Sequence, residues 1–163
     1  MKNIVLIGMM GCGKSTCGKL LAETLGREFV DTDAFIEHRE GRSIPDIFAN
    51  HGEDFFRALE REAARELAAR DDLVIACGGG LPMWDAAMGP LASSGLVVFL
   101  DRPPEDILAH VSMAGRPLGQ QGEAAFLARY AQREPAYRRW ANLTVPSQPT
   151  ARETVNLILE GLL

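Results

Sequence analysis

A glycine-rich run near the start of the chain carries the residues best suited to chemistry. Residues 8–15 read GMMGCGKS and fill every fixed position of the pattern G-x-x-x-x-G-K-[ST]. Such glycines let backbone N–H groups point at phosphate oxygens, while the lysine reaches the β and γ phosphates and the hydroxyl ligates Mg²⁺. The run predicts a phosphate-binding loop for ATP and Mg²⁺, with a merely tight strand-to-helix turn as the alternative. The residues expected to contact the nucleotide are Gly11, Cys12, Gly13, Lys14, Ser15 and Thr16.

Two carboxylates, Asp31 and Asp33, come directly after the next short apolar run, at residues 29–30. Residues two apart on an extended segment share a face, and ligands of open α/β sheets bind at the carboxyl ends of the strands. We expect Asp31 to join Ser15 in holding Mg²⁺, through a bound water, and Asp33 to act on an acceptor hydroxyl as a base or orienting group. Capping of the following helix is an equally good role for Asp33.

Three consecutive glycines, Gly78, Gly79 and Gly80, follow the third apolar run. Glycine loses more backbone entropy on folding than any other residue, which is reasonable where a ligand must approach the main chain closely. The triplet therefore indicates part of a binding site, with a plain loop as the alternative.

The elements that must position these residues alternate along the chain. Apolar runs at 4–7, 29–30, 73–76, 96–100 and 143–145 predict short strands that are buried on both faces. Helical spacing lies between them, as at residues 17–25 before Gly26 and at 56–67, and the Pro103-Pro104 pair predicts another helix start. This alternation predicts an α/β fold, with a five-stranded parallel sheet flanked by helices on both faces.

Composition limits the class of protein. A chain of 163 residues fits one domain, residues 1–163, and its formal charge of −5 argues against binding to nucleic acid. No apolar stretch is long enough to span a membrane, and the start lacks the features of a signal peptide, so we expect a cytoplasmic location. The three cysteines lack the spacing of a zinc site or a disulfide framework. We expect a monomer that binds small molecules.

The segment 112–122 breaks every periodicity. Gly115, Pro117, Gly119 and Gly122 fall within it. Such punctuation predicts a mobile loop, which we call the lid.

Taken together, these residues resemble one family, the shikimate kinases. The resemblance runs from the first apolar run to about residue 139 and is far more specific than a phosphate-binding loop alone. Besides that loop, the segments that carry it are Asp31-Thr32-Asp33, Gly41-Arg42-Ser43-Ile44, Asp46-Ile47-Phe48, Gly52-Glu53, Phe56-Arg57, Glu60, Gly78-Gly79-Gly80, Arg116-Pro117-Leu118, Arg133, Pro135 and Tyr137.

The resemblance implies a P-loop kinase that transfers the γ-phosphoryl group of ATP to the 3-hydroxyl of shikimate, within the synthesis of aromatic amino acids. It implies that Lys14, Asp33 and Arg116 are catalytic, with Arg116 in the lid meeting the transferring group and the nucleotide. It also implies that Arg57 and Arg133 hold the acceptor carboxylate. The remaining contacts to the acceptor would come from Asp33 and the backbone of Gly79 and Gly80, within a substrate-binding region at about residues 33–60.

Two features depart from the family pattern. Gly119 follows Leu118 in the lid, and residues 108–110, ending in His110, stand where the family carries an arginine that stacks on adenine. We therefore expect weaker selectivity for adenine, with Gln148 as a further contact to it. There are two alternative functions. The chain could be a kinase for another hydroxy acid such as gluconate, or a nucleotide-binding regulatory paralogue without turnover.

Overall fold

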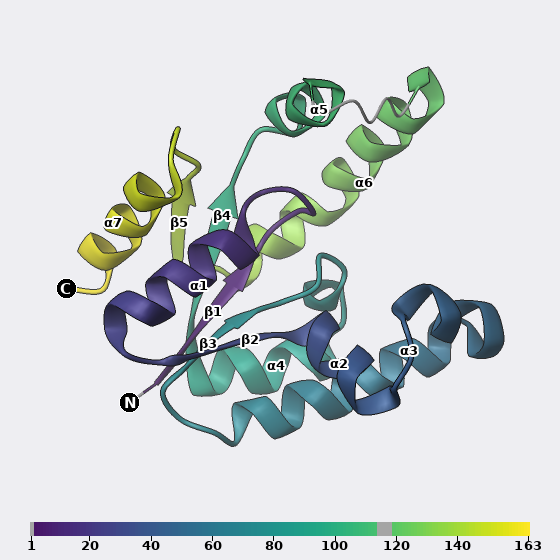
Figure 1. The fold of residues 1–163 in the computed structure, drawn as a ribbon, viewed down its shortest axis with the longest axis horizontal. Helices are drawn as coiled ribbons and strands as arrows, with labels where there is room; N and C mark the ends of the chain where they lie inside the picture. Colours follow the sequence, from purple (N-terminus) through teal and green to yellow (C-terminus); the bar gives the residue numbers. More distant parts are fainter. Residues whose placement is uncertain (1, 114–118) are drawn as a thin grey trace.

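The computed structural model describes residues 2–113 and 119–163, which form a five-stranded parallel sheet in the order β2-β3-β1-β4-β5 (Figure 1). Each strand falls on an apolar run expected from the sequence, so the predicted α/β fold with a parallel sheet is confirmed. The strands are β1 (Asn3–Ile7), β2 (Glu28–Asp31), β3 (Leu73–Ala76), β4 (Gly95–Asp101) and β5 (Leu143–Pro146).

Helices cover both faces of the sheet. Helices α1 (Lys14–Leu25) and α7 (Ala151–Gly161) pack together on one face, and α3 (Ile44–Ala68) and α4 (Asp85–Ser94) pack together on the other (Figure 1). The helical elements beside them are α2 (Thr32–Glu40), the 3₁₀ turn η1 (Leu81–Met83), α5 (Pro104–Met113) and α6 (Gly119–Trp140). The strands point their carboxyl ends toward α2 and α5, which is the edge where the sequence places its polar residues (Figure 1).

The centre of the sheet explains why β1 reads as an unbroken apolar run. All five of its residues are buried, because β3 and β4 flank it and helices cover both faces. Its one polar residue, Asn3, donates from Nδ2 to the carbonyl oxygen of Arg70 (2.9 Å) and accepts from the backbone N–H of Leu73 (2.9 Å). A buried amide is tolerated here because it is hydrogen-bonded, and it joins the start of β1 to the chain entering β3.

Two segments differ from the sequence expectation in detail. Helix α3 contains Gly52, whose φ of 82° lies in the left-handed region, so the helix is kinked within the substrate-binding region. The loop expected over residues 112–122 is helical at both of its ends, because α5 continues to Met113 and α6 already begins at Gly119, while residues 114–118 lie outside the described residues. Gly122 therefore lies inside α6. A glycine in a helix interior costs only about 1 kcal/mol relative to alanine, and the rest of this 22-residue helix tolerates that cost.

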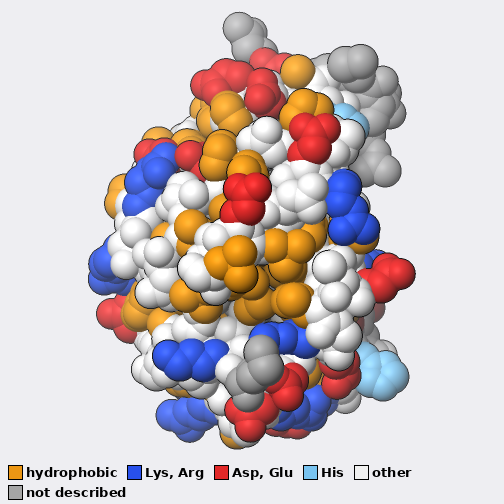
Figure 2. Space-filling model, turned by 90° about the vertical axis from the view of Figure 1, so that its left-hand side faces the viewer, with side chains coloured by type: hydrophobic (Ala, Val, Ile, Leu, Met, Phe, Trp, Pro, Cys, Tyr) orange, Lys and Arg blue, Asp and Glu red, His pale blue; other side chains and the backbone are white. Residues whose placement is uncertain are grey.

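The outer surface mixes charges of both signs. On the face drawn in Figure 2, basic and acidic side chains are interspersed around a central group of hydrophobic ones. That face offers no continuous basic surface of the kind that duplex nucleic acid requires. Within residues 2–113 and 119–163, every helix is too short or too polar to cross a lipid bilayer.

Candidate active site

The glycine-rich run forms a tight loop between β1 and α1. The backbone N–H of Cys12 donates to the carbonyl oxygen of Met9 (3.1 Å), which closes a turn in which Gly11 has a φ of 85°. A positive φ at this position of a turn favours glycine. The ammonium group of Lys14 lies inside the loop and donates to the carbonyl oxygens of Gly8 (2.6 Å) and Met9 (3.0 Å). The loop therefore has the compact form and central positive charge that a phosphate site needs.

Asp31 joins this loop to the end of β2. Its Oδ2 accepts a hydrogen bond from the Ser15 hydroxyl (3.1 Å), so the two expected metal ligands lie together. Its Oδ1 accepts from the backbone N–H groups of Asp33 (2.9 Å) and Ala34 (3.1 Å). Asp31 is therefore the N-cap of α2, and the capping role considered for Asp33 is wrong. The cap falls on Asp31 because helix α2 begins directly at Thr32.

The Asp33 carboxylate lies over the first glycine of the triplet. A Cβ atom built on Gly78 would lie 2.6 Å from Asp33 Oδ1, so a larger residue there would displace the Asp33 carboxylate. Burial and the neighbouring Asp31 carboxylate raise the pKa of Asp33, while Lys14 and Arg57 oppose that rise. A carboxyl group with a raised pKa beside a phosphate loop is well placed to accept a proton.

Two guanidinium groups converge over the other glycines. A Cβ atom on Gly79 would lie 2.9 Å from Nη1 of Arg133, and one on Gly80 would lie 3.0 Å from Nη2 of Arg57 and 3.2 Å from Nη2 of Arg133. The triplet is thus where side chains of α3 and α6 approach the main chain, as well as a surface open to a ligand. A side chain at any of the three positions would displace the polar ends of these side chains from their present places.

Arg57 is held in place by its neighbours, and one of its N–H groups makes no hydrogen bond to any described residue. Its Nη1 donates to Glu60, which is 1% exposed and whose pKa burial raises, although Arg57 opposes that rise. The guanidinium carbon lies 5.3 Å from the ring centroids of both Phe56 and Trp84. Its Nε is buried and donates no hydrogen bond within the part of the chain that the structure describes, with Glu53 Oε1 at 3.6 Å. The Nε therefore has an ion-pair partner but no hydrogen bond among the described residues, and the guanidinium group as a whole keeps positive charge at the wall of the site.

Tyr137 holds the backbone of the glycine triplet in position through a hydrogen bond. It is fully buried, and its hydroxyl donates to the carbonyl oxygen of Gly79 (2.6 Å). Burial raises its pKa to about 12, although Arg133 opposes the rise, so the phenol stays protonated as a donor. One turn of α6 thus carries both Arg133 and the residue that supports Gly79.

The charged side chains of this site, from Lys14 to Arg133, line a cavity of about 460 Å³, which we call the acceptor cavity, and Tyr137 supports its wall from behind. Sequence reasoning brought Lys14, Ser15, Asp31, Asp33, Arg57, the glycine triplet and Arg133 to this site, and all of them line it. It missed Arg129, which also lines the cavity. The signal was present, because Arg129 precedes Arg133 by four residues and so lies on the same face of α6.

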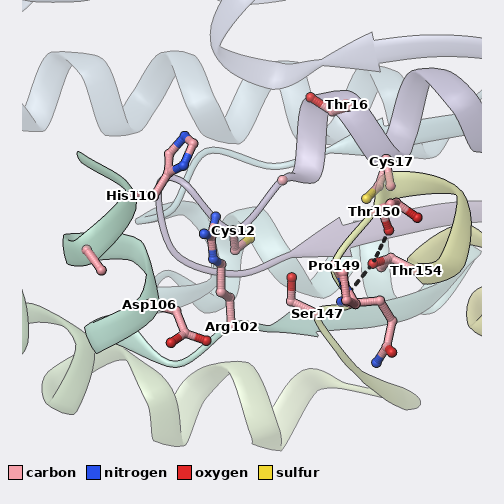
Figure 3. A pocket seen from close by; sticks show the side chains of 14 residues that line it. Cys12, Thr16, Cys17, Arg102, Asp106, His110, Ser147, Pro149, Thr150 and Thr154 are labelled. Atoms are coloured by element: carbon pink, nitrogen blue, oxygen red, sulfur yellow. Dashed lines mark hydrogen bonds between the residues drawn. The ribbon is translucent and has the colours of Figure 1, made fainter. Parts of the chain in front are cut away.

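A further cavity of about 660 Å³, the nucleotide cavity, lies on the other side of the phosphate loop (Figure 3). Its lining includes three of the expected nucleotide contacts, Cys12, Gly13 and Thr16, together with His110 and Gln148. It also includes Arg102, which the sequence analysis did not single out. Arg116 belongs to residues 114–118 and lies outside the described residues.

Comparison with known proteins gives one consistent result. A family model described as shikimate kinase matches residues 10–163. A shikimate kinase of Clostridium botulinum (strain Eklund 17B / Type B) is 39% identical over 159 residues, which is 97% of this chain and 96% of the relative. The solved structure of a shikimate kinase from Acinetobacter baumannii in complex with shikimate superposes with a TM-score of 0.90 at 38% identity, covering 99% of this chain and 93% of the other.

A more distant likeness bears on the alternative acceptor. A gluconokinase from Sinorhizobium meliloti superposes with a TM-score of 0.65 at 20% identity, covering 99% of this chain and 91% of the other. Similarity at that level shows a shared fold alone.

Proposed function

Because the chain belongs to the shikimate kinase family and is an ATP-dependent kinase that acts on an alcohol group, we propose that it transfers the γ-phosphoryl group of ATP to the 3-hydroxyl of shikimate. The observation that carries this proposal is the convergence of the Arg57 and Arg133 guanidinium groups over Gly80. A guanidinium pair suits a carboxylate, because its N–H groups match the two oxygens.

The acceptor fits between these arginines and the phosphate loop. With its carboxylate on Arg57 and Arg133, the ring would rest on Gly79 and Gly80, and a hydroxyl would reach Asp33. The oxygen of that hydroxyl would form the new bond to the γ-phosphorus, while the bond from this phosphorus to the departing ADP breaks. Asp33 would accept the proton that the hydroxyl loses. The positive charge of Lys14 would stabilise the charge that spreads over the transferring oxygens.

Mg²⁺ fits the oxygen pair formed by Ser15 and Asp31. Hydroxyl and carboxylate oxygens are the ligands that this ion prefers, and it keeps several waters. We propose that Ser15 would ligate the ion and Asp31 would hold one of its waters. When bound, the ion would neutralise phosphate charge.

The lid, its Arg116, the cytoplasmic location and the monomeric state remain predictions from the sequence. Closure of the lid over both cavities would exclude water and suppress hydrolysis of ATP. Arg116 would then supply a further positive charge to the transferring group.

The acceptor site is tested by replacing its arginines. We expect Arg57→Ala or Arg133→Ala to raise KM for shikimate by roughly tenfold to a hundredfold, because hydrogen bonds to a charged group contribute about 1.5–3 kcal/mol. KM for ATP should stay nearly constant. A coupled assay of ADP release with shikimate, shikimate amide and gluconate measures this, and Arg61→Ala on the same helix is the matched control.

The amide provides the decisive comparison. It should be a poorer substrate than shikimate for the unaltered protein and nearly equal to it for the double arginine variant, since the lost partners are the same. Equal phosphorylation of amide and acid by the unaltered protein would remove the carboxylate site. Preference for gluconate would instead support the alternative acceptor, and absence of any transfer would support the regulatory paralogue.

Trp84 should report acceptor binding through its fluorescence. The residue is 43% exposed and its ring centroid lies 5.3 Å from the Arg57 guanidinium carbon, so a carboxylate on Arg57 would change its electrostatic surroundings. Titration with shikimate should give a saturable change in emission that Trp84→Phe abolishes. Trp140→Phe is the control. The Trp140 indole donates to the carbonyl oxygen of Pro82 (2.9 Å), so we do not expect its emission to respond to the acceptor, and the change should persist in this variant. A change that survives in Trp84→Phe and is lost in Trp140→Phe contradicts the assignment.

A further inference from the structure

Arg102 enters the nucleotide cavity from the segment that joins β4 to α5. It is half-buried, and its Nη1 donates to the carbonyl oxygen of Gly11 at the tip of the phosphate loop (2.9 Å). Figure 3 shows it on the same side of the cavity as His110 and Asp106, whereas Pro149 and Thr150 come from the segment between β5 and α7. The contact joins residues that are 91 positions apart in the sequence.

The bond to Gly11 holds the guanidinium group at one place. Arginine has five N–H donors, of which this bond uses one, and the others donate to no residue that the structure describes. Ordering a long side chain on ligand binding normally has an entropic cost of up to about 2 kcal/mol. The bond to Gly11 already restricts the Arg102 side chain in the folded protein, so this cost of binding is reduced. A ligand that binds to the remaining donors or to the flat face of the group therefore meets a preorganised partner.

The other residues that line the cavity leave a role for such a group. Arg102 is the one permanently charged cation in the described lining, and no Phe, Tyr or Trp belongs to that lining. A nucleotide base needs a flat partner for its faces. In this cavity the groups with a face broad enough to cover a base are the planar Arg102 guanidinium and His110 imidazole and the apolar Pro149 ring.

We propose that Arg102 recognises the base of the nucleotide by stacking its guanidinium plane on it, with the Gly11 carbonyl as the anchor that sets the plane. Guanidinium groups stack on aromatic rings through their delocalised charge, whereas an ammonium group has no plane to offer. This inference rests on the proposed function, because it assumes that ATP occupies the nucleotide cavity. It also changes the expectation from the sequence, since the cavity holds an arginine although residues 108–110 do not supply one.

Two probes separate contact with the base from support of the loop. Binding of a non-hydrolysable ATP analogue and of inorganic tripolyphosphate, each with Mg²⁺, is measured by calorimetry. We expect Arg102→Ala to weaken binding of the analogue by roughly fivefold to thirtyfold and to leave tripolyphosphate unchanged, because tripolyphosphate has no base. Arg102→Lys keeps the charge and a donor for Gly11 but loses the plane, so it should recover the affinity only in part.

Arg152→Ala is the matched control, since it removes the same charge from α7 at a position that does not line the cavity. Equal weakening of both probes would mean that Arg102 acts only by supporting the phosphate loop, and would overturn the proposal. Unchanged binding, or full recovery by Arg102→Lys, would overturn it as well. The lysine variant keeps the test decisive if Arg102→Ala fails to fold. Failure of the unaltered protein to bind the analogue would instead refute the proposed function.

Discussion

Replacing Lys14 by Met is expected to lower kcat for phosphoryl transfer by roughly 10²–10³ or more. Loss of a single fixed donor to the charge of a transition state has an effect of this size. The Lys14 ammonium lies at the centre of the phosphate loop, within 3.0 Å of two of its carbonyl oxygens, and any phosphate that enters the loop must pass close to it. Its charge therefore acts on the phosphates in both the ground state and the transition state.

The same contacts define what must be checked beside activity. Lys14 also supports the loop, so Lys14→Met removes hydrogen bonds worth about 1 kcal/mol each to the folded state. Thermal unfolding followed by circular dichroism should show a fold that is retained with a slightly lower Tm. Lys19→Met, which removes an exposed lysine of the same helix, is the control and should keep full activity. Near-normal turnover of Lys14→Met would contradict the assignment of the phosphate loop.

Replacing Asp33 by Asn is expected to lower kcat by roughly 10²–10⁴, the range that general bases contribute. Its carboxylate faces the acceptor cavity above Gly78, and its backbone rather than its side chain takes part in capping α2. Because the base must be ionised, activity should also fall as the pH drops through the raised pKa of Asp33. Steady-state kinetics over a range of pH, with shikimate saturating, measures both effects.

Stability should move in the opposite direction to activity. The pKa of Asp33 is higher in the folded than in the unfolded chain, so its ionised form destabilises the fold above that pKa. Asp33→Asn should therefore raise the free energy of unfolding near pH 7. The gain should shrink as the pH falls through the folded-state pKa toward the unfolded-state value. Urea titrations at several pH values test this. A loss of stability in Asp33→Asn with unchanged kcat would mean that Asp33 is structural and not a catalytic base.

The strands and the glycine-rich loop could be predicted because their signals are local. An apolar run buried on both faces marks each strand, and the fixed spacing of Gly8, Gly13, Lys14 and Ser15 marks the loop without reference to distant residues. Arg57 and Arg133 carry no local signal of this kind. They were found through the resemblance to a family, and the structure brings both to one cavity.

Residues whose roles depend on a distant partner escaped prediction. Arg102 contacts Gly11, and Trp84 contacts Arg57, only after the sheet has ordered its strands. The choice of Asp31 over Asp33 as the helix cap depends on where α2 begins, to within one residue. Sequence patterns define element boundaries less sharply than that, so the two carboxylates could not be told apart.

Helix α6 is a single long helix that can transmit a tilt from the acceptor cavity to its far end. Its 22 residues span about 33 Å, and Arg133 and Tyr137 lie near the end that supports the acceptor cavity, while Gly119 is the first residue at the opposite end. Between Gly119 and Arg133 the axis is about 21 Å long, so a tilt of about 5° at the acceptor end displaces the other end by roughly 2 Å. A small adjustment around a carboxylate bound by Arg133 would thereby be enlarged, through the length of the helix, into a displacement of about 2 Å at Gly119.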